Sequence, residues 1–171
     1  MRLPFMVLFL AGCGSQIGEV APLKAPLNDY RTVSVEVASG PQVEQPTVQQ
    51  AQLAMALEKA LRDERAFEVV PKSGELVVRV TIDGVSAPSG SQEALCRARS
   101  VLCVSDEARV QGRADIVDGK SGFTLGTIAG TGTSNRSHDG FKLDAVQKSP
   151  SAMAHDDFAW MISGYLVKHR K

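Results

Sequence analysis

The chain has 171 residues, with 19 lysines and arginines balanced by 19 aspartates and glutamates. A protein without net charge lacks the electrostatic basis for general nucleic-acid binding, so we expect no nucleic acid among its partners. The length matches one ordinary domain with a core of its own.

The N-terminus has the order of a secretion signal, in which a positive charge precedes a short apolar run. Arg2 supplies the charge, and only Pro4 interrupts the apolar run that ends at Leu10. This run is far shorter than the ~20 residues that span a bilayer, so we expect no retained transmembrane helix. The next residues are Ala11, Gly12 and Cys13, and the stretch Leu10-Ala11-Gly12-Cys13 resembles the lipobox of bacterial lipoproteins.

This resemblance implies that residues 1–12 are removed as a signal peptide and that Cys13 carries the acyl chains of a membrane anchor. Several acyl chains make a durable anchor, whereas a single chain gives only marginal membrane residence. Gly14 takes the place of the aspartate that retains such proteins in the inner membrane of enteric-type bacteria, which implies the periplasmic side of the outer membrane. The alternative interpretation is a buried N-terminal strand with Cys13 in the core, although Arg2 before it is unusual for such a strand.

The segment that follows shows no sustained periodicity and is interrupted by Gly18, Pro22 and Pro26. Such a pattern is typical of a linker. We therefore predict a lipidated flexible tether over residues 13–30 and a single domain over residues 31–171.

The first predicted strand covers residues 32–37, because valines alternate there with polar residues, and Gly40-Pro41 ends it. A helix is predicted from Val48 to Arg65, with Thr47 as its N-cap and Gln50 completing a capping box. One face of this helix carries leucines four residues apart, at Leu53, Leu57 and Leu61.

Four further strands are predicted. A short one at residues 67–70 ends at Pro71, and a longer one at residues 75–85 places Arg79, Thr81 and Asp83 on the face opposite its apolar residues. Residues 108–117 and 123–133 form a hairpin around a turn at residues 118–122.

The long segment between these two pairs of strands, residues 86–106, is rich in serine, alanine and glycine and contains Cys96 and Cys103. In an exported protein a disulfide is the expected state of such a pair. A metal site is the alternative, but it needs two more ligands, and the nearest histidine is His138 in a separate loop.

A last helix is predicted after Ser149 as N-cap and Pro150 at the first helical position. It ends in the cationic sequence Lys168 to Lys171, where the helix dipole favours positive charge. The spacing of its apolar residues is helical, at Ala154, Phe158, Met161, Ile162 and Tyr165. Together these elements predict an α+β fold, with two amphipathic helices packed on one face of a mainly antiparallel sheet.

The order of these elements carries a resemblance to a family. The lipobox, the stretches AFEVV, ELVVRVTIDGV and IVDGKSG, and the closing amphipathic helix resemble small lipoproteins related to the TolB N-terminal domain and the curli-secretion lipoprotein. The resemblance implies a part in assembling or supporting an envelope complex.

Three patterns suggest chemistry, and each has a structural alternative. Ser137-His138-Asp139 has the residue types of a hydrolase triad, but consecutive side chains cannot reach one another as such a triad requires. His155-Asp156-Asp157 offers metal ligands, but adjacent helical positions diverge, so we expect an exposed first turn with acids near its positive end. The glycines of the last strand lack the following helix of a phosphate loop and indicate a bulge or close helix packing instead, at Gly126, Gly130 and Gly132.

We therefore expect no catalytic residues, no cofactor and no metal. The predicted function is that of a non-catalytic accessory or assembly factor, held at the membrane through Cys13 and bound to an envelope protein, with self-association left open. One rival is a component like the lipopolysaccharide-transport lipoprotein, which a basic lipid-binding stripe would favour, and none is evident. An enzyme with an unfamiliar site is the other.

Overall fold

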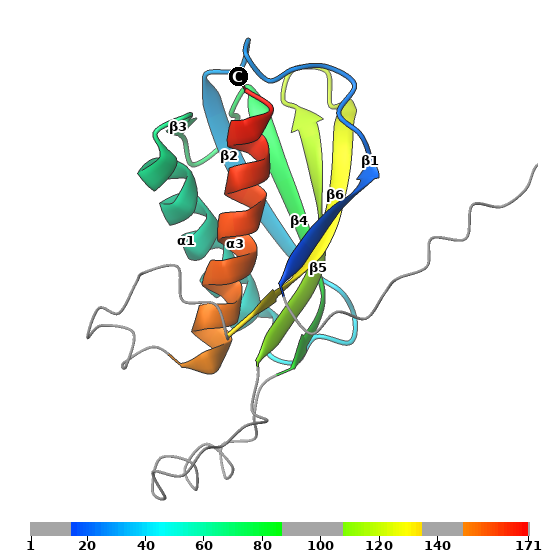
Figure 1. Cartoon of the computed structure of the whole chain (residues 1–171), viewed down its shortest axis with the longest axis vertical. Helices are drawn as coiled ribbons and strands as arrows, with labels where there is room; N and C mark the ends of the chain where they lie inside the picture. Colours follow the sequence, from blue (N-terminus) through cyan, green and yellow to red (C-terminus); the bar gives the residue numbers. More distant parts are fainter. Residues whose placement is uncertain (1–14, 87–107, 135–148, 171) are drawn as a thin grey trace, which may run out of the picture.

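The computed structural model describes residues 15–86, 108–134 and 149–170, which form six strands and two helices (Figure 1). In chain order these are β1 (Gln16–Ala21), β2 (Thr32–Ser39), α1 (Pro46–Glu64), β3 (Glu68–Val69), β4 (Leu76–Ser86), β5 (Arg109–Asp118), β6 (Thr124–Thr133) and α3 (Pro150–Lys168).

All six strands belong to one sheet with the order β1-β6-β5-β4-β2-β3. The pairings β1–β6, β6–β5 and β5–β4 are antiparallel, and β4–β2 and β2–β3 are parallel. The predicted α+β class with a mainly antiparallel sheet is confirmed. The parallel pairs arise because α1 carries the chain from the end of β2 back to the start of β4, as a crossover between parallel strands requires.

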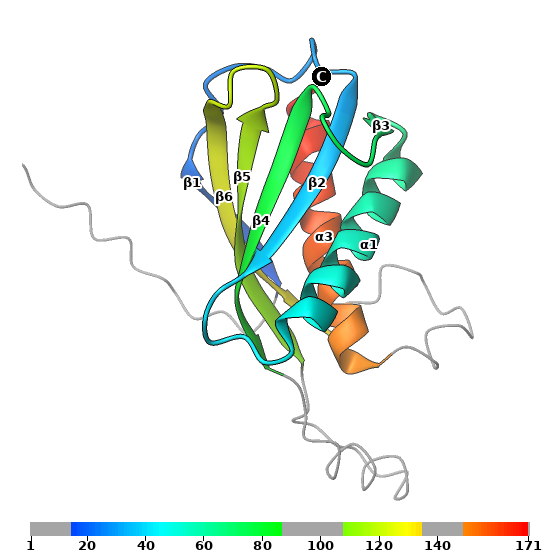
Figure 2. The same cartoon turned by 180° about the vertical axis from the view of Figure 1, so that it is seen from behind.

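Both helices pack on the same face of the sheet and against each other, and Figure 2 shows the opposite face without a helix. Successive side chains of a strand point to opposite faces of the sheet, and the apolar ones point toward the helices. There they pack against the leucines predicted for α1. The fully buried core includes Leu53, Leu57, Leu61, Val78, Val80, Ile116, Ile128, Phe158 and Ile162.

The start of α1 differs from the prediction. The helix begins at Pro46, and its N-cap position is Gln45, which has a left-handed φ of 49° and makes no side-chain capping bond. Thr47 therefore lies inside the first turn and cannot act as the N-cap, so the predicted capping box with Gln50 is wrong. A proline fits the first helical position because its missing N–H would have no partner there. For α3, by contrast, Ser149 is the N-cap as predicted, since its side chain accepts a hydrogen bond from the backbone N–H of Ala152.

The predicted flexible tether is the second difference. Within residues 13–30 the described part contains β1, which pairs along β6, and Leu27, which is fully buried in the core. The backbone N–H of Leu27 donates to the carbonyl of His169 at 3.0 Å. Because strand pairing and core burial both fix this segment, it forms part of the domain rather than a linker.

Candidate functional site: the open face of the sheet

Several of the residues singled out in the sequence lie outside the described residues. Cys13, Cys96, Cys103 and His138 fall in this group, and so do Ser137 and Asp139, so lipidation, the disulfide, its metal alternative and the interpretation of the Ser137-His138-Asp139 pattern stay predictions.

His155 does not lie in an exposed turn, contrary to the prediction, because only 1% of its surface is exposed. Its Nδ1 lies 2.7 Å from the carbonyl oxygen of Ser151 one turn earlier, so this nitrogen carries a proton and donates it to the carbonyl. Burial lowers the pKa of His155 below its usual value, since it disfavours the charged ring. Its Nε2 has no hydrogen-bond partner among the described residues. The side chain is therefore a core residue.

Asp157 is also buried rather than exposed, and it has a structural role. Its Oδ2 accepts a hydrogen bond of 2.9 Å from the backbone N–H of Thr133, at the end of β6. The carboxylate thereby joins α3 to the last residue of the sheet, and it satisfies a backbone donor that would otherwise be buried without a partner.

The glycines of β6 allow close packing, as the sequence indicated. A Cβ at Gly132 would lie 2.4 Å from the carbonyl oxygen of Ala154 and 2.6 Å from the Cβ of Phe158, so α3 can approach the strand only over a glycine. A Cβ at Gly130 would lie 2.5 Å from the carbonyl oxygen of Gln16 in β1. Neither position is part of a phosphate loop.

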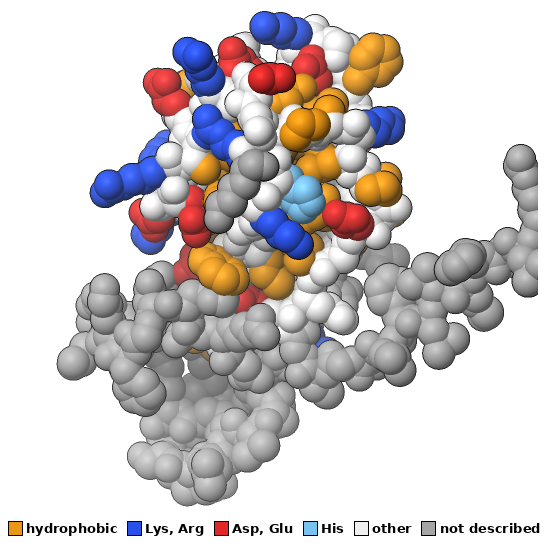
Figure 3. Space-filling model, turned by 45° about the horizontal axis from the view of Figure 1, so that its top comes forward, with side chains coloured by type: hydrophobic (Ala, Val, Ile, Leu, Met, Phe, Trp, Pro, Cys, Tyr) orange, Lys and Arg blue, Asp and Glu red, His pale blue; other side chains and the backbone are white. Residues whose placement is uncertain are grey.

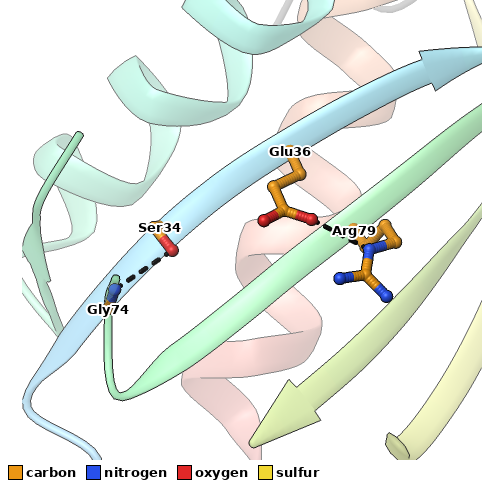
Figure 4. A network of polar contacts seen from close by, with 4 residues as sticks. All are labelled: Ser34, Glu36, Gly74 and Arg79. Atoms are coloured by element: carbon orange, nitrogen blue, oxygen red, sulfur yellow. Dashed lines mark hydrogen bonds and ion pairs between the residues drawn. The ribbon is translucent and has the colours of Figure 1, made fainter. Parts of the chain in front are cut away.

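The face of the sheet without helices carries a row of polar side chains in register across four strands. Arg79 of β4 donates from Nε to Oε2 of Glu36 on β2 at 2.9 Å, and Figure 4 shows these two side chains pointing toward one another. In β5 and β6, the hydroxyl of Thr127 donates to Oδ1 of Asp115 at 2.7 Å. Arg79 and Asp115 are register partners, so the row runs unbroken from β2 to β6.

A second row lies beside it in the same register, made of Ala38, Thr81, Arg113 and Ala129. We call these two rows, eight residues in all, the open face. Side chains here are small, polar or charged, and Arg79 and Glu36 are 53% and 54% exposed. None of these charged side chains is part of the hydrophobic core. They are therefore available to contact another molecule.

One end of the sheet is closed by a network of loops, which we call the distal end. Tyr30 donates its hydroxyl to Oδ2 of Asp118 at 2.9 Å, and Glu75 accepts the backbone N–H of Arg31 at 2.7 Å. Hydrogen bonds from Ser121, first from its backbone and then from its hydroxyl, together with the bond from Tyr30, lower the pKa of Asp118 to about 2. Burial and the neighbouring Asp118 raise the pKa of Tyr30 to about 12. Charged side chains of both signs and apolar side chains intermingle over this end (Figure 3), so it carries no single-sign patch.

The first strand and the last helix are joined near the end of α3. The hydroxyl of Tyr165 donates to Oε1 of Glu19 in β1 at 2.9 Å. Burial, with this bond to a carboxylate, raises the pKa of Tyr165 to about 12. The ring of His169 lies 4.2 Å from the Tyr165 ring. These contacts hold the edge strand β1 against the last helix.

The described ranges contain no group of three or more His, Cys, Asp or Glu side chains placed to hold a metal ion. Neither α1 nor α3 has the combination of length and apolar character needed to cross a membrane.

No protein-family model matches the sequence, and no curated protein matches it. Several solved structures do resemble the domain. A PelC dodecamer from Paraburkholderia phytofirmans has a TM-score of 0.56 at 15% identity, with 86% of this chain and 96% of that chain covered. A DUF330 protein from Xanthomonas campestris has a TM-score of 0.55 at 10% identity, with 85% and 88% covered. A hypothetical protein from Chlamydia trachomatis has a TM-score of 0.51 at 10% identity, with 82% and 98% covered. At these identities the likeness is one of fold.

Proposed function

We propose that this protein is a lipid-anchored accessory or assembly factor of the bacterial envelope, acting without catalysis through protein-protein contact. The observation that carries the proposal is the open face, where two in-register rows of side chains take no part in the core. An antiparallel sheet can keep one face in water, so exposure alone would not suggest a partner. Here, however, opposite charges are fixed at defined spacings by strand register, and such a pattern favours recognition of a complementary surface.

Self-association is part of the proposal. The PelC structure that shares this fold is a dodecamer. The open face is suited to contact with another copy because it carries both signs of charge, Glu36 and Asp115 against Arg79 and Arg113. Opposite charges on one surface can pair with those of a second identical surface related by two-fold symmetry.

In-cell crosslinking tests the contact part of the proposal. A photoreactive residue at Arg113, in the middle of the open face, is expected to capture a defined protein, either a second copy or another envelope protein. The same residue at Lys59, on the outer surface of α1 and 67% exposed, is the matched control. Equal capture from both positions, or none from Arg113, would contradict a partner at this face.

Metabolic labelling tests the anchor. Labelled fatty acid is expected to enter the wild-type protein and to be absent from a Cys13→Ser variant, which should be released as a soluble domain. Equal labelling of both proteins would refute acylation at Cys13.

A further inference from the structure

The point where the chain enters the domain is fixed. The hydroxyl of Ser15 lies 2.9 Å from the hydroxyl of Thr133, and the next residue, Gln16, is already in register with Thr131. The first contact, at Ser15, is therefore two residues after Cys13, and strand pairing begins at the third, Gln16. Two residues of fully extended chain span at most about 7 Å.

The site that receives Ser15 is part of the packed domain. The N–H of Thr133 is bonded to the buried carboxylate of Asp157, and the preceding Gly132 is in close contact with α3. Ser15 is therefore bonded to a residue that contacts both the sheet and α3. The chain joins the domain at its packed core rather than at a loop.

This attachment lies at one end of the sheet. Strand register aligns Thr133 of β6 with Arg109 of β5, and Arg109 with Ser86 of β4. We call Ser15, Ser86, Arg109 and Thr133 the anchor end. The distal end lies at the other end of the same strands, where Asp118 pairs with Leu76. Ten residues of β5 at about 3.3 Å each separate the two ends by roughly 30 Å.

We infer that the domain stands upright on the membrane, with the anchor end against the phospholipid headgroups and the distal end pointing away from them. The inference rests on the proposed acylation of Cys13. A free tether over residues 13–30 would let the domain lie about 23 Å from the lipid. The two residues that separate Cys13 from Ser15 in the sequence allow about 7 Å. The short connection leaves the anchor end as the part of the domain that the lipid can reach.

The outer surface of the helix layer is mixed rather than apolar, because the exposed side chains of Val48 and Met55 on α1 and Trp160 on α3 lie among charged residues. On α1 this surface carries the exposed ion pairs Lys59–Asp63 and Arg62–Glu58. Insertion of such charges into the headgroup and acyl boundary would cost desolvation energy without burying a continuous apolar face, so the geometry disfavours a domain lying on its helices. In the upright orientation the strands run along the membrane normal, and the open face looks sideways, where a second anchored copy would approach it.

Fluorescence quenching on vesicles tests this orientation. The full acylated protein is reconstituted in phosphatidylethanolamine and phosphatidylglycerol vesicles that contain a headgroup-labelled quencher lipid. A fluorophore is attached through a non-natural amino acid either at Ser86, at the anchor end, or at Phe123, which is 75% exposed beside the distal end. We expect stronger quenching at Ser86 than at Phe123.

A tether variant provides the matched control. Insertion of 20 glycine and serine residues between Gly14 and Ser15 leaves every described contact in place but extends the reach to about 25 Å, so the difference in quenching should disappear. Vesicle-bound wild-type protein with equal quenching at both positions would overturn the upright orientation while leaving the anchor intact. Protein that carries no acyl chain and does not sediment with vesicles would overturn the anchor, and the orientation with it.

Discussion

The two faces of the sheet are made by the same strands but are stabilised differently. The covered face consists of apolar side chains packed under α1 and α3, with glycines where α3 approaches most closely. The open face consists of exposed and partly exposed charged, polar and small residues held in position by strand register. Substitutions on the covered face should therefore change the free energy of unfolding, and substitutions on the open face should change association. Four predictions test this division, beginning with the largest effect.

The first prediction concerns Gly132 on the covered face. In Gly132→Val the new side chain would collide with the backbone of α3, because even a Cβ would lie 2.4 Å from the Ala154 carbonyl oxygen. Overpacking typically costs about 1–3 kcal/mol of unfolding free energy, and we expect the upper end of that range here because the clash is with backbone atoms. Gly18→Val in β1 is the control, since a Cβ there has no atom within 4 Å. Urea denaturation of the two Cys13→Ser variants decides the matter, and equal midpoints would show that α3 is not closely packed on β6.

The second prediction concerns the bond between the sheet and α3. Asp157→Ala leaves the buried N–H of Thr133 without its acceptor, which should cost about 1–3 kcal/mol. Asp157→Asn keeps an oxygen in the same place and should recover part of that loss. If both variants unfold at the urea concentration of the parent protein, the carboxylate has no structural role.

The third prediction concerns pH. The pKa of His155 is lowered by burial, so above the unfolded value of about 6.5 the residue is neutral in both states and has no effect on stability. As the pH falls below 6.5, the unfolded chain binds a proton that the folded chain does not, and the unfolding free energy falls by at most about 1.4 kcal/mol per pH unit until the folded pKa is reached.

His155→Gln should remove this part of the acid sensitivity, whereas His169→Gln, at the end of α3, should retain it. Thermal unfolding between pH 7.5 and 5 is the measurement. An unchanged pH profile in His155→Gln would mean that the buried ring is not the group responsible.

The fourth prediction is the smallest in stability and concerns the open face. Arg79→Ala removes an ion pair whose two partners are about half exposed, so the unfolding free energy should fall by less than about 1 kcal/mol. Crosslinking from position 113 should nevertheless decrease. A large loss of stability, or unchanged crosslinking, would contradict the separation of roles between the two faces.

Sequence patterns predicted the covered face well, because burial imposes a period on the residues. The leucines of α1 and the alternating apolar residues of β4 were located correctly, and so were the hairpin of β5 and β6 and the serine cap of α3. The polar side of β4, with Arg79 and Thr81, was also evident from alternation. The sequence did not show that Arg79 lies beside Glu36 and Asp115, since strand order and register depend on contacts between distant parts of the chain.

The N-terminal segment was misread for a similar reason. β1 is an edge strand of six residues in which only Ile17 and Ala21 are partly buried, so its apolar alternation is too weak to detect. Leu27 is a single buried residue without a periodic neighbourhood. The burial of His155 and Asp157 was missed because both are polar, and polar residues in a first helical turn usually face water. The signal that could have revealed them is the run of small and apolar residues around them on α3.

The bonds between β1 and the end of α3 bear on how the chain acquires its structure. Glu19 and Tyr165 are 146 residues apart, and Ser15 and Thr133 are 118 apart. Contacts between such remote residues slow folding, because a long loop must close before they contribute any stability. During synthesis β1 is made first but finds its partner β6 only after most of the chain exists. The domain therefore remains incomplete until the final helix is available, later than in a fold built from local contacts.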